Sequence, residues 1–169
     1  LGHHRNFLVQ VRDESGWERG DGKGMSALEY TLTIAGTAYY RGYLVGKKCP
    51  RVQRNFVLYS TLVVFGIALL CWFRFMPALF VFLLPMTISL LFTAWVTYDH
   101  HAGLDTDDAF EASYNNTNRF FNLLTGNLGY HTAHHYRPGV HWSKLPELHE
   151  KIKHRIPPAL MRNARFVFT

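Results

Sequence analysis

The chain has 169 residues, of which 48% are hydrophobic and only 18% are charged, and its formal net charge is +6. This length suits one domain, and the apolar content disfavours an ordinary soluble protein. The basic charge does not indicate nucleic-acid binding, because Arg74 is the single basic residue between positions 56 and 98 and no basic stripe with interleaved aromatic residues is present.

The first 25 residues are polar and rich in glycine, which predicts a solvated loop that carries the adjacent histidines His3 and His4. From position 26 to 45, hydrophobic residues and tyrosines recur at helical spacing, which predicts a helix with Ser26 as its N-cap. Such a helix suits either the membrane interface or the amphipathic layer of a protein core, and the pattern leaves both interpretations open.

Two long uncharged segments follow, with 18 residues at 56–73 and 24 residues at 75–98. As helices they would be roughly 27 and 36 Å long, against a hydrocarbon core of about 30 Å. Arg74 marks a tight turn between them, from which its side chain can reach lipid headgroups, and Pro85 is expected to kink the second helix. The sequence therefore predicts a transmembrane hairpin at about 56–98, in preference to a buried hairpin in a soluble core.

The open ends of a hairpin lie on the same face of the membrane. Basic residues gather just before the first span and predict that this face is cytoplasmic; they are Arg41, Lys47, Lys48, Arg51 and Arg54. We therefore expect one domain over residues 1–169, an all-α integral membrane helical bundle with a transmembrane hairpin, interfacial and cytoplasmic helices, and a histidine-rich cytoplasmic segment at 99–169. Histidines from both ends of the chain can then meet on one face.

Two further clusters of histidines follow the hairpin, and their members are His100, His101, His131, His134 and His135. A helix over 128–136 would place the last three on one face, because positions i, i+3 and i+4 are neighbours on a helix. Three neutral imidazoles on one face make a strong transition-metal site. Zinc is normally satisfied by three or four ligands, so the larger number of clustered histidines favours two ions, and an all-nitrogen set suits iron, copper or zinc.

These motifs resemble the C-terminal part of an integral-membrane fatty acid desaturase, a superfamily that also contains hydroxylases and carotenoid ketolases. The superfamily has three histidine boxes around two irons, and HTAHH at 131–135 matches the last box. LGHH resembles the end of the middle box, whose first histidine would fall immediately before Leu1. TYDHHAG resembles an additional ligand site at the end of a membrane helix, where the alignment favours His101 over His100. The first box is missing, so the resemblance implies a fragment that is incomplete as given.

The resemblance implies an oxygen-dependent oxidoreductase with two iron ions, O2 as co-substrate, and an aliphatic or acyl substrate that enters from the bilayer. Fatty acyl desaturation is the first expectation, with hydroxylation or carotenoid ketolation as alternatives. The chain has no flavin, nicotinamide or haem-binding motif, which implies an external electron donor of the ferredoxin or cytochrome type. The implied metal ligands are His3, His4, His101, His131, His134 and His135, with His100 as a weaker candidate.

Side chains near the ligands are candidates for orienting them. Asn127 ranks first because it precedes His131 by one helical turn, and Asp99 and His141 are the other candidates. Two alternatives come from other classes, a membrane zinc hydrolase and a metal-binding membrane protein. The absence of HExxH counts against the first, and the absence of histidine and carboxylate residues from 56–98 counts against a metal transporter.

Overall fold

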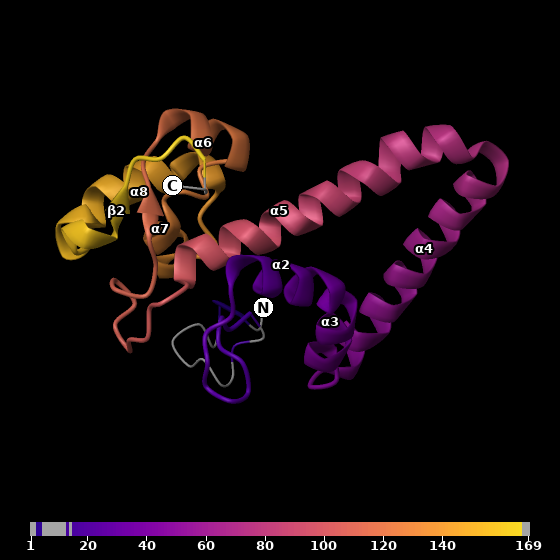
Figure 1. Ribbon diagram of the computed structural model, residues 1–169, viewed down its shortest axis with the longest axis horizontal. Coiled ribbons are helices and arrows are strands. Elements are labelled where there is room, and N and C mark those ends of the chain that lie inside the picture. The colour runs from indigo at the N-terminus through magenta and orange to yellow at the C-terminus, as the bar shows by residue number, and fades with distance from the viewer. Residues whose placement is uncertain (1–2, 5–12, 14, 167–169) are drawn as a thin grey trace. The chain divides into compact units, whose positions relative to one another are not determined.

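The computed structural model describes residues 3–4, 13 and 15–166 (Figure 1). Contacts divide the chain into two compact units. We call Leu28–Ala94 the apolar unit, and Leu1–Ala27 together with Trp95–Thr169 the histidine unit. Helices dominate the described residues, which confirms the prediction of a mainly helical chain.

The apolar unit is built from consecutive helices, two of which extend across its borders. They are α2 (Ala27–Gly36), α3 (Ala38–Gly46), α4 (Pro50–Ala78), the π-helical turn η1 (Leu79–Leu83) and α5 (Leu84–His101). The segment predicted as one helix at 26–45 is divided at Thr37, whose backbone lies outside the α-helical region. Its start agrees with the prediction, because α2 begins directly after Ser26.

Two glycines allow α3 to pack closely against α4. A Cβ atom at Gly42 would lie 2.9 Å from the ring of Phe56, and one at Gly46 would lie 3.1 Å from the Cα of Gln53. The ring of Tyr39 packs 6.2 Å from that of Phe56 and extends the contact. These small residues therefore attach α3 to the first turns of the long apolar helix.

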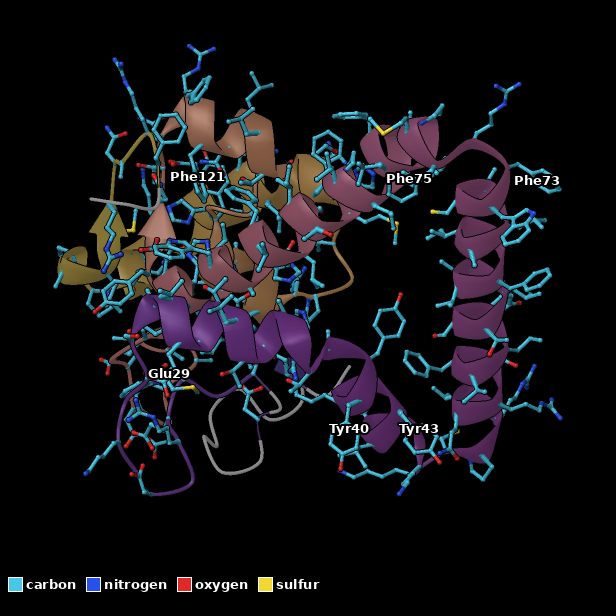
Figure 2. The ribbon with its side chains drawn as sticks, turned by 45° about the vertical axis from the view of Figure 1, so that its right-hand side comes forward. Glu29, Tyr40, Tyr43, Phe73, Phe75 and Phe121 are labelled. Atoms are coloured by element: carbon cyan, nitrogen blue, oxygen red, sulfur yellow. The ribbon has the colours of Figure 1, made fainter. Side chains whose placement is uncertain are left out.

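The long apolar run is broken at Arg74, where the sequence predicts a turn. The Arg74 backbone has φ −149° and ψ 71°, so α4 consists of two helices that meet there, and Figure 2 shows Phe73 and Phe75 on either side of the turn. Pro77 falls in the first turn of the second helix, where its missing N–H costs no hydrogen bond. The π-helical turn η1 ends just ahead of Pro85, so the helix departs from α geometry beside that proline.

Apolar side chains are exposed along this run. The exposed fraction reaches 85% at Trp72 and 69% at Phe73. Pro50–His101 is the one stretch of the described helices that is long and apolar enough to cross a membrane, with a mean hydropathy of 2.3 in its most apolar window and none of that window buried. A core helix of a soluble protein would be mostly buried, so this surface is compatible with contact to lipid.

Besides the N-terminal residues and the end of α5, the histidine unit contains short elements that follow α5. They are β1 (Asn115–Asn116), α6 (Arg119–Thr125), α7 (His131–Tyr136), η2 (Trp142–Lys144), α8 (Leu145–Ile152), η3 (Lys153–Arg155), η4 (Pro158–Leu160) and β2 (Met161–Arg162). The two strands pair in parallel, with Asn115 opposite Met161 and Asn116 opposite Arg162. Figure 1 shows α6, α7, α8 and β2 gathered in the orange to yellow part of the chain.

The helix expected at 128–136 is shorter than predicted, because α7 begins at His131. Gly126 and Asn127 both have left-handed backbone conformations, with φ of 61° and 64°, which end α6. Tyr130, with φ −82° and ψ 56°, also lies outside the α-helical region, so α7 begins directly after it. The main hydrophobic core packs α7 against α8, and Ala133 of α7 is completely buried in it. The other buried members of this core are Phe110, Leu145, Ile152, Ile156 and Leu160.

Candidate metal centre

Four imidazoles from three separate parts of the histidine unit converge. We call them the four-histidine cluster; its members are His3, His101, His131 and His135. One ring nitrogen of each lies within 4.8 Å of those of the others. Nε2 of His131 lies 3.0 Å from Nε2 of His101, and Nε2 of His135 lies 3.1 Å from that of His131 and 3.2 Å from that of His101. His3 near the N-terminus, the end of α5 and the helix α7 therefore meet at one point.

Backbone carbonyl groups fix the orientation of two rings in this cluster. Nδ1 of His101 lies 2.8 Å from the carbonyl oxygen of Ala112, and Nδ1 of His131 lies 3.3 Å from that of Leu128. A carbonyl oxygen can only accept, so each Nδ1 carries the proton and each Nε2 keeps its lone pair. Both lone pairs thus face the centre of the cluster.

The third ring is oriented by a side chain that the sequence analysis did not identify. Asp13 accepts a hydrogen bond from Nδ1 of His3 at 2.7 Å, and its carboxylate is only 4% exposed. This aspartate comes ten positions after the histidine in a polar, glycine-rich part of the sequence, where neither helical nor strand spacing indicates a contact. The nitrogen of His3 that remains for the cluster is Nε2.

The nitrogen separations fit a shared cation. Lone pairs that face each other at 3.0–3.2 Å repel unless a positive charge lies between them. Metal–imidazole bonds of about 2.0–2.1 Å separate neighbouring nitrogens by about 2.9–3.4 Å for bond angles between square and tetrahedral. The nitrogens of His101, His131 and His135 therefore suit a shared transition-metal ion, and that of His3 lies within 4.8 Å of them. A shell of imidazoles is typical for iron, copper, nickel or zinc.

Burial keeps His131 and His135 in the neutral form that binds metal. Desolvation lowers the pKa of His131 well below its ordinary value of 6.5, with a further contribution from His100. Desolvation also lowers the pKa of His135, and neighbouring His101 adds to that shift. Because a charged imidazole cannot coordinate a cation, the fold prepares both side chains for metal at neutral pH.

A second pair of imidazoles lies beside the four-histidine cluster. Nε2 of His4 is 3.2 Å from Nε2 of His134, and the ring of His4 is 5.0 Å from that of His135. Burial, followed by the proximity of His134, lowers the pKa of His4 to about 4. Nδ1 of His4 is buried and has no hydrogen-bond partner among the described residues. The pair offers two further neutral nitrogens next to the cluster.

These pKa shifts predict that acid destabilises the protein. Between pH 6.5 and about 4 the unfolded chain takes up protons at these imidazoles that the folded chain does not, so stability falls as the pH decreases through that window. We expect the metal-free protein to melt at a clearly lower temperature at pH 5 than at pH 7.5, and the loaded protein to release metal over the same range. Thermal unfolding and metal content at both pH values check this, and an unchanged melting temperature would contradict it.

His100 and its neighbour His101 have different environments. His101 belongs to the cluster, whereas His100 lies behind it, with its ring stacked on that of His131 at 4.0 Å between centroids and 6° between planes. Nδ1 of His100 donates to the carbonyl oxygen of Tyr114 at 2.8 Å. The structure thus places His101 among the converging nitrogens and His100 outside that group.

The sequence predicts that three side chains orient the ligand histidines, and in the structure these side chains form hydrogen bonds to other groups. The Asn127 amide donates to the carbonyl oxygen of Trp142 at 3.2 Å, and Asp99 accepts from Arg162 at 3.1 Å. His141 is exposed, and its side chain caps the start of η2. Two carbonyl groups and Asp13 hold the rings instead, so ring orientation depends mainly on backbone groups that no residue pattern reveals.

A network of asparagines holds the segment that leads into α7. Asn122 donates to the carbonyl oxygen of Asn116 at 2.7 Å and accepts from the N–H of Gly129 at 3.0 Å. Asn115 accepts from the N–H of Thr132 at 3.1 Å and donates to its hydroxyl at 2.7 Å. Because Thr132 follows His131 directly, this buried network sets the position of the ligand helix.

The chain is similar to a known protein family. A family model described as fatty acid desaturase matches residues 1–165, which is nearly the whole chain and includes every histidine of the three clusters. No curated protein and no solved structure matches the chain.

Proposed function

Because the chain belongs to the fatty acid desaturase family, we propose that it is a membrane-bound di-iron oxidoreductase that desaturates a fatty acyl chain. The observation that carries this proposal is the convergence of four imidazoles from distant parts of the sequence. The match to the family supports an oxidoreductase, and the all-nitrogen donor set supports a redox-active metal.

The four-histidine cluster would hold one iron, and His4 and His134 would contribute to the site of a second. Two irons together with O2 supply the oxidising power to remove hydrogen from an unactivated C–H bond. The protein holds the metals with imidazoles, which resist oxidation better than thiolates. His101 and His131 stay oriented through their carbonyl partners, and burial keeps water from the ligand atoms.

The substrate class follows from the apolar unit and from the family. An exposed apolar run of the length of Pro50–His101 supports a bilayer location, and an acyl chain would then reach the metal from the lipid. Hydroxylation of an aliphatic chain and carotenoid ketolation are alternatives that would use the same metal centre. They would differ from desaturation in the placement of the substrate, so the products distinguish them.

The membrane topology is proposed as a hairpin. The break at Arg74 divides the apolar run into two helices, so both the start of α4 and the end of α5 would lie on one face. The basic residues that precede the first span indicate the cytoplasmic face, which would place the histidine clusters there.

The two cysteines provide a test of this topology. In a Cys71→Ala variant, Cys49 is the remaining thiol and lies just before the first span, so a membrane-impermeant maleimide should label it in inside-out vesicles and not in intact cells. In a variant without native cysteines, Arg74→Cys places a thiol in the turn, and labelling should occur in intact cells only. Labelling of both positions from the same side would contradict the hairpin.

An external electron donor is also proposed, and exposed basic side chains would form its docking surface. They are Lys144, Lys151, Lys153 and Arg155. Glu147 and Glu150 pair with two of these lysines at 2.7 and 2.6 Å, and the surface remains basic overall. An acidic ferredoxin or cytochrome would be attracted to it, so turnover should fall with ionic strength when the donor is limiting. Anionic lipid headgroups could bind the same surface.

Product analysis tests the proposed function. The full-length protein is expressed in membranes with iron and a ferredoxin-type reducing system, and the acyl chains are analysed by mass spectrometry. A new double bond that depends on O2 and on the donor is the expected result. A hydroxyl or keto product would indicate a hydroxylase or a ketolase instead of a desaturase. Hydrolysis products together with bound zinc would support the zinc hydrolase.

A further inference from the structure

Asp13 differs from the other groups that orient the candidate ligands. His101 and His131 are held by carbonyl groups of the backbone, whereas His3 is held by the carboxylate of a residue ten positions later in the sequence. Oδ2 of Asp13 accepts from Nδ1 of His3 at 2.7 Å. Oδ1 accepts from the backbone N–H of Ser15 at 2.8 Å. The side chain is almost completely buried, and both of its oxygens are engaged.

We propose that Asp13 is a positioning residue of the metal centre. Its carboxylate keeps the proton of His3 on Nδ1 and thereby directs the lone pair of Nε2 at the four-histidine cluster. A carboxylate that accepts from a ligand imidazole also makes the imidazole a stronger donor to the metal. This inference rests on the proposed function, because it assigns Asp13 a role in holding the metal.

The effect of an asparagine at this position follows from the hydrogen-bond geometry. The N–H of Ser15 needs an acceptor, so the amide oxygen of an asparagine would take the place of Oδ1. Its NH2 group would then face Nδ1 of His3 and donate to it. Nδ1 would have to become the acceptor, which moves the proton to Nε2. The loop would keep its turn, and the ligand would have the wrong tautomer for metal binding.

Asp21 provides a matched control. Its Oδ1 accepts from the backbone N–H of Lys23, two residues later, at 3.1 Å, as Oδ1 of Asp13 does from that of Ser15. The side chain of Asp21 is exposed and far from the histidines in sequence. Asp21→Asn therefore makes the same chemical change in the same loop. It should affect neither the tautomer of His3 nor the binding of metal.

The experiment measures Co²⁺ affinity by titration of the metal-free full-length protein, together with the tautomer of His3 from ¹⁵N chemical shifts of histidine-labelled protein. We expect Asp13→Asn to weaken Co²⁺ binding by about 10–100-fold and to show the proton on Nε2 of His3. Asp13→Ala should weaken binding similarly, and Asp21→Asn should match the wild type. The thermal unfolding of metal-free Asp13→Asn should stay close to that of the wild type, because the turn is retained.

The outcomes separate this inference from the proposed function. Wild-type Co²⁺ affinity and the unchanged Nδ1–H tautomer in Asp13→Asn would overturn the inference, even if the wild type binds metal as proposed. If the wild type binds no metal but Asp13→Asn still moves the proton of His3, the orienting contact stands and the proposed metal site fails. A purely structural role predicts that Asp13→Asn resembles the wild type and that Asp13→Ala alone is impaired.

Discussion

Replacing His101 with alanine is expected to abolish activity and to weaken metal binding by more than about 100-fold. Loss of a residue that hydrogen-bonds to a metal ligand typically lowers metal affinity by about 10–100-fold, and loss of the ligand itself lowers it further. Nε2 of His101 lies within 3.2 Å of the corresponding atoms of both His131 and His135, so its removal opens the centre of the cluster.

The neighbouring residue supplies the control for this prediction. His100→Phe keeps a flat ring that can stack on His131, and it removes a buried Nε2 that has no hydrogen-bond partner among the described residues. It also removes the hydrogen bond to the carbonyl oxygen of Tyr114, which costs about 1 kcal/mol. We expect this variant to retain its metal. Equal loss of metal in both variants would contradict the distinct roles of the two histidines.

Gly129→Ala is expected to destabilise the protein strongly. A Cβ atom at this position would overlap the carbonyl oxygen of Asn116 and would lie 2.7 Å from Oδ1 of Asn122. Both atoms belong to the hydrogen-bond network in front of α7, and neither is the end of a flexible chain. We expect a loss of about 3 kcal/mol, or roughly 6–12 °C in melting temperature, together with a loss of metal because α7 moves.

Gly139→Ala is the matched control in the same unit. A Cβ atom there meets nothing within 4 Å, and the backbone of Gly139 is not left-handed. The added methyl group should leave the melting temperature unchanged or raise it slightly, because it restricts the unfolded chain. A Gly129→Ala variant with the same melting temperature as the wild type would show that the hydrogen-bond network does not constrain α7.

The features that the sequence predicts well are those that depend on local patterns. The break at Arg74 follows from one charge between two uncharged segments. The common face of His131 and His135 follows from helical spacing alone. Their meeting with His3 was expected from a topology that places both ends of the chain on one side, and the four-histidine cluster has this contact.

The features that the sequence does not predict depend on tertiary contacts and on special backbone conformations. Asn127 was expected to support His131 on the assumption of a continuous helix, but its left-handed backbone, with φ of 64°, turns it toward Trp142. The contact of Asp13 with His3 joins positions ten residues apart in a polar, glycine-rich part of the sequence that has no helical or strand periodicity. Carbonyl groups that orient rings, such as that of Ala112, carry no residue-type signal at all.

The metal content of the purified full-length protein is the most direct test of the central claim, that imidazoles from distant segments share a redox-active metal centre. Elemental analysis after expression with iron, and with zinc available in competition, gives the identity and the number of the bound ions. The proposed function predicts two irons per chain, lost together when His131 is replaced by alanine. A single zinc per chain, or iron content that does not change in the His131→Ala variant, would contradict it.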